Sequence, residues 1–291
     1  MAMQQHIRNP IEWGWDSLKN TGRAMNSAGH TIEGAWEGHD RSIPAVQRIT
    51  AADLWEVLRD GFEDFGAYRT DVIFLCLLYP IIGLVLSRMV LGYGMVPLVF
   101  PLASGFALIA PFFAVGLYEM SRRREAGRDN GWADAFGVAS SPALGSIMGL
   151  GLLLLALFAL WMGAAHIIWL LTLGPEPPAN LGVFAQQVFT TGPGWIMALA
   201  GIAVGFVFAV AVLVLSVVSF PLLIDRDVGM GTAIATSLKV VEANPGPMAL
   251  WGLMIAGLLV LGSIPLLLGL AIVFPVLGHA TWHLYRKVLP R

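Results

Sequence analysis

The sequence is short of charge and of cysteine. Charged residues make up 12% of its 291 positions, and Cys76 is the single cysteine. Soluble domains carry about twice that share of charge, so an ordinary globular protein is excluded. One cysteine cannot form a disulfide within the chain. The net charge of −2 gives no basic surface for nucleic acid, and no such partner is predicted.

Apolar residues are what the sequence has in excess. They make up 57% of the chain, and the mean hydropathy is +0.73. Several apolar runs exceed the roughly 20 residues that an α-helix needs to cross a bilayer. Composition therefore predicts an all-α, polytopic membrane helix bundle whose first partner is the lipid bilayer.

Six membrane spans are expected. The last apolar run, residues 246–285, has 40 residues, and one helix of that length would reach about 60 Å, twice the hydrocarbon thickness. It should fold back at Gly262–Pro265, where glycine and proline interrupt the pattern. The second span carries Pro97, Pro101 and Pro111 and should be kinked. Within a transmembrane domain over residues 71–288, the expected spans are 71–91, 95–120, 145–173, 194–224, 246–262 and 265–285.

Basic residues fall on one side of such a bundle. All but one of the 17 Lys and Arg lie before the first span, after the second or fourth span, or at the C-terminus. Arg88 is the exception. Because basic loops stay in the cytoplasm, we expect a multi-pass protein of the bacterial inner membrane with both termini cytoplasmic.

The part before the first span is expected to hold one amphipathic helix. Residues 1–49 are predicted to be a weakly ordered cytoplasmic tail, and Thr50 and Asp53 have the spacing of a capping box. Over residues 50–70, apolar side chains recur at helical spacing: Leu54, Trp55, Leu58, Phe62 and Phe65. The pattern predicts a helix at the membrane surface, or one packed on the cytoplasmic ends of other helices.

Two histidines four residues apart lie near the C-terminus. His279 and His283 share a helix face, as metal-binding pairs can. The segment HATWH lacks the glutamate of HExxH, so a third ligand would have to be Glu119, Asp225 or Asp227. A metal at this pair is one hypothesis.

The alternative for these histidines is structural. A belt at headgroup level could be formed by Trp282, His283, Tyr285 and Arg286, or the group could make structural hydrogen bonds. A haem shared with His166 is not expected, because that residue lies near the outer side of the third span. No cofactor is therefore predicted.

The remaining candidates concern structure rather than chemistry. Acids and arginines near the cytoplasmic interface should pair and lock helix ends: Glu119, Arg122, Asp225, Arg226 and Asp227. Two GxxxG pairs predict close helix packing, either within the chain or with a partner: Gly145 with Gly149, and Gly201 with Gly205.

Three stretches carry a family resemblance. They are RITAADLWEVLRDGFEDF, PLASGFALIAPFFAVGLYEMSRRREAG and PVLGHATWHLYR. They resemble an uncharacterised bacterial family of predicted integral membrane proteins, domain of unknown function 2189, over roughly Ile43 to Val288. Some members are labelled as cytochrome c oxidase subunits. The resemblance implies a membrane fold and no catalytic residues.

No enzyme motif is present in the sequence, so catalysis is not expected. The preferred interpretation is a structural or accessory subunit of a membrane complex, such as a respiratory one, that contacts other subunits or its own copies. A transporter or lipid-handling protein with a cavity near the proline-rich second span is the alternative. A metal- or haem-binding oxidase component is the third.

Overall fold

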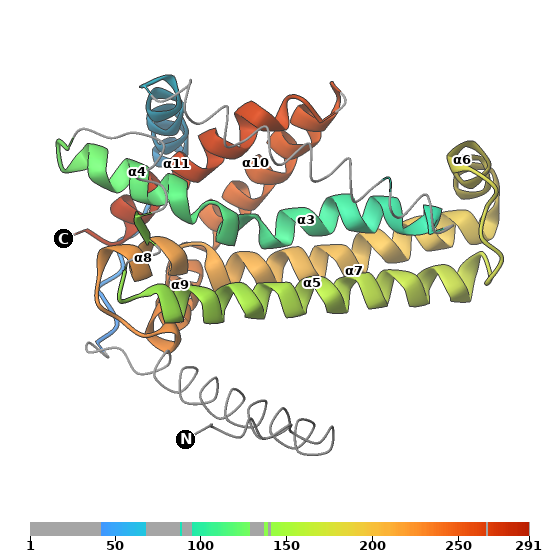
Figure 1. Cartoon of the computed structure of the whole chain (residues 1–291), viewed down its shortest axis with the longest axis horizontal. Coiled ribbons are helices and arrows are strands. Elements are labelled where there is room, and N and C mark those ends of the chain that lie inside the picture. The colour runs from blue at the N-terminus through green and yellow to red at the C-terminus, as the bar shows by residue number, and fades with distance from the viewer. Residues whose placement is uncertain are drawn as a thin grey trace, which may run out of the picture.

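The structure is a computed structural model that describes residues 42–67, 88, 95–128, 137–138, 141–265 and 267–290. The regular elements in these ranges are helices, in agreement with the all-α prediction (Figure 1). Residues 1–41 of the expected tail lie outside the described residues, and so does the first expected span except for Arg88.

Three long helices form the body of the molecule. α3 (Val99–Phe113) packs against α5 (Leu144–Thr172), and α5 packs against α7 (Gly192–Ser216). Figure 1 shows the three lying side by side. At one end of this body, the short helix α6 (Leu181–Thr190) contacts the 3-10 turn η1 (Val96–Leu98) that precedes α3.

Four stretches of the described residues are long and apolar enough to cross a membrane. They are Val96–Glu125, Leu144–Thr172, Gly192–Asp225 and Pro245–Ser263, and they correspond to the second to fifth expected spans. α11 (Leu270–Val288) stands where the sixth was expected but is not among them. Its C-terminal half carries histidine, arginine and lysine, which lower its hydropathy.

Two of the long helices bend at the end opposite α6. α3 gives way to α4 (Val115–Glu125) one turn after Pro111. α7 gives way to α8 (Ser219–Asp225) just after Val217. Pro221 explains the second break, because proline has no N–H for the carbonyl of Val217 and its ring clashes with that carbonyl.

α10 (Pro245–Ser263) and α11 pack as a hairpin that leans away from the three long helices (Figure 1). The neck of the hairpin is tight, since a Cβ added to Gly269 would lie 2.7 Å from the carbonyl oxygen of Gly262. Leu267 in the turn has a φ of 68°, in the left-handed region that tight turns use.

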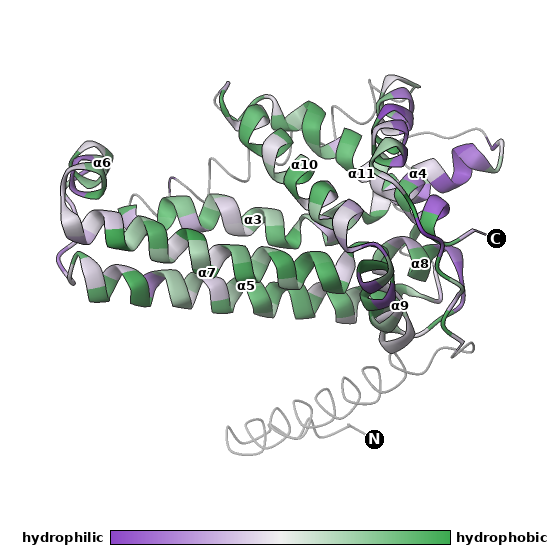
Figure 2. Cartoon of the chain, turned by 180° about the vertical axis from the view of Figure 1, so that it is seen from behind, coloured by the Kyte–Doolittle hydropathy of each residue, from purple (hydrophilic) through white to green (hydrophobic). Residues whose placement is uncertain are grey.

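Apolar and polar residues separate along the molecule (Figure 2). α5, α7 and α10 are hydrophobic over most of their surface, as helices that face lipid are. Polar residues gather on the helix over residues 51–67, on α4 and on the end of α11. α9 (Met230–Ala243), which links α8 to α10, lies in the same region. We call this region the polar end.

The glycine pairs predicted to mediate packing contact other helices at one member each. A Cβ on Gly149 would lie 3.2 Å from Sδ of Met230, and one on Gly205 would lie 3.0 Å from the ring of Trp161. Gly145 and Gly201 have open space around them among the residues that the structure describes. Close packing between the described helices therefore involves one glycine of each pair.

The helix over residues 51–67 is capped and has two apolar sides. The backbone N–H of Thr50 donates to Oδ2 of Asp53 at 2.7 Å, which is one of the two contacts of a capping box, and the Thr50 hydroxyl donates to the same oxygen at 2.7 Å. Leu54 and Phe65 are buried against other helices, whereas Trp55 and Phe62 are exposed. One side of this helix therefore packs on other helices, as the second of the two expectations had it, and the other side is exposed.

Close backbone approaches hold α11 against its neighbours. A Cβ on Gly61 would lie 2.6 Å from the backbone nitrogen of Ala280, and one on Gly278 would lie 2.6 Å from Cδ1 of Leu117. α11 is therefore packed tightly against the helix over residues 51–67 on one side and against α4 on another.

We expect Gly61→Ala to destabilise the protein by about 1–3 kcal/mol, because its methyl group must displace the α11 backbone. Gly66→Ala is the matched control, since a Cβ there has nothing within 4 Å in the described structure. In a helix, alanine is otherwise preferred over glycine. Thermal unfolding in detergent would measure both, and equal midpoints would contradict the close approach.

Candidate functional site

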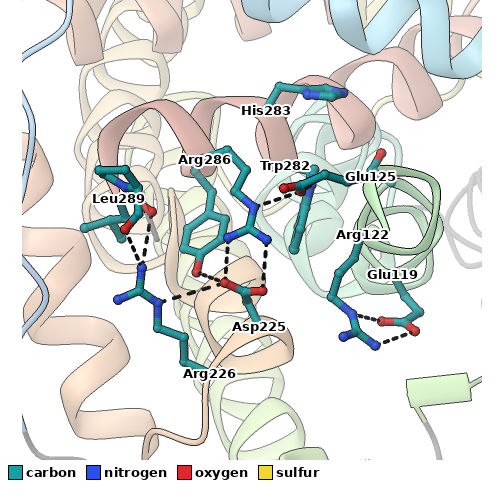
Figure 3. A network of polar contacts seen from close by, with 12 residues as sticks. Glu119, Arg122, Glu125, Asp225, Arg226, Trp282, His283, Arg286 and Leu289 are labelled. Carbon is teal, nitrogen blue, oxygen red and sulfur yellow. Dashed lines mark hydrogen bonds and ion pairs between the residues drawn. The ribbon is translucent and has the colours of Figure 1, made fainter. Parts of the chain in front are cut away.

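The C-terminal half of α11 presents polar groups on two faces, and both faces are buried. His279 and His283 lie on one face, while Trp282, Tyr285 and Arg286 lie on another. Figure 3 shows Trp282 and Arg286 directed toward the ends of α4 and α8. Buried polar groups need partners, and each face finds them on segments far away in sequence.

The first face forms what we call the Arg286 cluster. The guanidinium of Arg286 donates from Nη1 to Oδ2 of Asp225 at 2.8 Å and from Nη2 to Oδ1 at 3.1 Å, a two-point contact. Its Nε donates to Glu125 at 2.8 Å (Figure 3). Tyr285 donates to Asp225 at 2.6 Å, and the indole of Trp282 donates to Glu125 at 3.1 Å. One arginine thus joins the ends of α4 and α8.

Aromatic rings complete this cluster. The guanidinium carbon of Arg286 lies 4.9 Å from the ring centre of Trp282 and 5.5 Å from that of Tyr285. Such cation–π contacts gain strength where water is excluded, and both rings are fully buried. Arg286 is therefore held by charge, by hydrogen bonds and by stacking at once.

Two further arginine contacts border the cluster. Arg226 donates from Nη2 to the carbonyl of Pro290 at 2.8 Å, while its Nε lies 3.9 Å from Asp225. Glu119 accepts from Arg122 and from Arg123 at 2.7 Å each. Glu119 is 3% exposed, so these two bonds offset the cost of burying its charge.

The second face of α11 forms the Asp64 cluster. Asp64, from the helix over residues 51–67, is 5% exposed. Its carboxylate accepts from Ser121 at 2.6 Å and from Arg124 at 2.7 Å, both on α4. Nε2 of His283 lies 2.9 Å from Oδ2 of Asp64, and Nδ1 of His279 lies 2.7 Å from the hydroxyl oxygen of Ser121. One carboxylate thus ties three helical segments together.

The proton positions in this cluster follow from counting donors. Ser121 has one hydroxyl proton, and an ionised carboxylate only accepts. Ser121 must therefore donate to Asp64 and accept from His279, which places a proton on Nδ1 of His279. Nε2 of His283 must likewise carry a proton to bond with Asp64. These two ring nitrogens are donors and cannot bind a metal in this arrangement.

The pKa of Asp64 is set by two opposed effects. Burial raises it, but hydrogen bonds from His283 and Ser121 and the nearby imidazoles lower it more, so it lies below its ordinary value of 3.8. Asp64 is therefore ionised at neutral pH, as the donor count requires.

At the rim of the polar end, side chains of α11 and of the residue after α9 contact the start of the helix over residues 51–67 and the chain just before it. Lys287 donates to Asp53 at 3.2 Å and to Glu56 at 2.6 Å. The pKa of Asp53 is lowered to about 2 by the hydrogen bonds from Thr50 and by Lys287. The side chain of Asn244 accepts from the backbone N–H of Ile49 at 2.8 Å. These contacts fasten the start of the helix over residues 51–67.

The structure places the predicted site residues in an arrangement that differs from the expected one. The acid beside His279 and His283 is Asp64, and none of the three loop acids proposed as a third ligand takes that place. Asp225 pairs chiefly with Arg286, 61 residues away, and less closely with its neighbour Arg226.

Trp282, which was expected either in a belt at headgroup level or in structural hydrogen bonds, is fully buried and donates to Glu125. Glu119 and Arg122 pair within one helix, as the spacing predicted. Asp64, Ser121 and Glu125 were not among the predicted site residues. From the sequence, Asp64 could have been found only by noting that a charged residue falls on the apolar side of its helix.

No group of three or more His, Cys, Asp or Glu side chains in the described ranges is arranged to hold a metal. His166 lies on α5, which ends near α6, so it is at the end of the molecule opposite His279. The imidazoles of His166, His279 and His283 therefore do not converge on a common centre.

We expect Arg286→Gln to cost about 3–5 kcal/mol of stability, the usual loss when one partner of a buried ion pair is removed. Arg286 and Asp225 are each 13% exposed, whereas Arg59 and Glu63 are 79% and 57% exposed. Arg59→Gln is therefore the control and should cost less than about 1 kcal/mol. Thermal unfolding in detergent separates the two, and equal losses would contradict a buried clamp.

The lowered pKa of Asp64 predicts a pH dependence. A carboxylate with a depressed folded pKa stabilises the fold above its unfolded pKa and loses that contribution as pH falls through the folded value. The wild-type midpoint should therefore drop as pH falls below 3.8, the ordinary value. Asp64→Asn should be less stable at neutral pH and should lose less on acidification. Asp60→Asn, on the same helix, should keep the wild-type slope.

Comparison with known proteins bears on the middle of the chain. Residues 99–225, from the start of α3 to the end of α8, match the family described as Predicted integral membrane protein (DUF2189). This is narrower than the stretch over which the resemblance was expected. No curated protein and no solved structure matches the chain. The chain is a multi-pass integral membrane protein, and over these residues it is similar to the DUF2189 family.

Proposed function

We propose that the protein is a non-catalytic structural or accessory subunit of a membrane complex in the bacterial inner membrane. The observation that carries this proposal is that its carboxylates at the helix ends are occupied by hydrogen bonds. Asp64, Glu119 and Asp225 each accept hydrogen bonds from two or more side chains. Carboxylates engaged in this way lock helix ends and are not poised to move protons or bind substrate.

The proposal includes six crossings with both termini in the cytoplasm. The helix over residues 51–67 ends at the polar end, whereas Met95 adjoins η1, which lies beside α6 at the opposite end. Residues 68–94 link these two ends, which supports a crossing between them. The described basic side chains of α4 and α11, with Arg226 just after α8, lie at the polar end, and the positive-inside rule then favours the cytoplasm for this end.

The transport alternative, with a cavity at the kinked second span, has less support from packing. A Cβ on Gly105 would lie 2.7 Å from the ring of Phe158, and one on Gly151 would lie 2.5 Å from the ring of Phe112. The indole of Trp161 donates to the carbonyl of Pro101 at 2.9 Å. Side chains of α5 therefore fill the space beside α3.

The experiment is to extract the protein from its native membranes in a mild detergent and separate the extract on a native gel. A structural subunit should migrate in a larger assembly of fixed stoichiometry. Migration as a free chain in every mild detergent would contradict that role. Disrupting the polar end with Arg286→Gln should release the chain from the assembly.

The same purified sample tests the oxidase alternative. The donor roles of His279 and His283 predict a colourless protein without stoichiometric metal. A Soret band, or one metal per chain that is lost in both His279→Ala and His283→Ala, would contradict the proposal and favour the cofactor-binding alternative.

A further inference from the structure

An apolar groove lies between the helix over residues 51–67 and the α10–α11 hairpin. Its volume is about 400 Å³. The walls are formed on one side by Trp55 and Phe62, and on the other by Leu258 of α10 with Ile272 and Val276 of α11. Among the described residues, the Arg286 and Asp64 clusters take no part in lining it.

Arg59 gives the groove one cationic edge. It is the charged residue among the described side chains that line the groove. Its Nε donates to Glu63 at 3.0 Å, and 79% of its side chain is exposed. The contact with Glu63 orients the guanidinium while leaving most of it accessible, and a guanidinium matches phosphate oxygens in geometry.

The two large aromatic residues of the groove are not buried by the protein. Trp55 is 63% exposed and Phe62 is 59% exposed. Aromatic side chains are enriched where a bilayer meets water, and the groove lies at the polar end, where that boundary is expected. α10, which forms part of one wall, also carries exposed Leu253, Val260 and Leu261, so lipid is expected around the hairpin that borders the groove.

An apolar slot with a cation at its edge is complementary to one class of bilayer molecule. We propose that this groove binds an anionic phospholipid, with an acyl chain between the helix over residues 51–67 and α11 and with its phosphate against Arg59. A neutral lipid gains only the apolar contact, whereas a basic residue near an anionic headgroup adds roughly 1 kcal/mol. This site goes beyond the accessory role and does not depend on it.

Native mass spectrometry of the full chain in detergent tests the preference for negative charge. The protein is titrated with dioleoyl phosphatidylglycerol and, separately, with dioleoyl phosphatidylcholine. We expect the first phosphatidylglycerol to bind more tightly, and Arg59→Gln to weaken it about fivefold, the equivalent of one basic residue. Arg48→Gln, an exposed arginine outside the groove, should leave binding unchanged. Equal affinity of wild type and Arg59→Gln would overturn the proposal.

Photo-crosslinking identifies what occupies the groove. p-Benzoylphenylalanine replaces Phe62 in the full chain, and the protein is irradiated in vesicles of equal amounts of the two lipids. Adducts enriched in phosphatidylglycerol support the proposal, and Arg59→Gln should abolish the enrichment. The same probe at Leu253, which is 67% exposed on α10, should give lipid adducts without enrichment.

Two other products would overturn the proposal. An adduct to residues 68–94 would mean that the chain itself fills the groove. An adduct to a second copy would make the groove an interface between subunits. A thermal midpoint equal to that of wild type is required of each variant, so that a folding defect is not mistaken for a lost lipid.

Discussion

The buried polar half of α11 is the constraint on which the rest of the polar end depends. Burying a helix that carries two histidines, a tyrosine, a tryptophan and an arginine is costly, and partners for these polar side chains offset much of that cost. Asp64 serves one face of α11, and Asp225 with Glu125 serves the other. The helix ends around α11 are therefore fixed by electrostatics as much as by apolar packing.

Steric fit makes these contacts possible. Gly61 and Gly278 allow the helix over residues 51–67 and α4 to approach α11 so closely that added methyl groups would clash. Only at that separation can the short side chains of Asp64 and Ser121 reach the imidazoles. The bend after Val217 similarly brings Asp225, at the end of α8, to Arg286. Backbone shape and charge pairing thus support one another.

Local features could be predicted from the sequence, because they depend on neighbours along the chain. The cap formed by Thr50 and Asp53, three residues apart, is an example. The pair of Glu119 and Arg122 on one helix turn is another. The partners of His283 and Arg286 could not be predicted, since Asp64 and Asp225 lie 219 and 61 residues away. Spacing along one helix shows which side chains share a face but not what that face meets.

Composition by itself determined that this chain is an all-α membrane protein, because apolar runs of sufficient length have no stable alternative to helices in lipid. The position of the apolar runs also located the helix over residues 144–172 and the start of the helix over residues 192–216, which was expected to continue to residue 224. Only the tertiary structure decided that Trp282 is buried, that the histidines donate to Asp64 and Ser121, and that one side of the helix over residues 51–67 stays open beside α11. The reason is physical: burial in lipid depends on total hydropathy, whereas hydrogen bonds depend on distances of a few ångströms between segments remote in sequence.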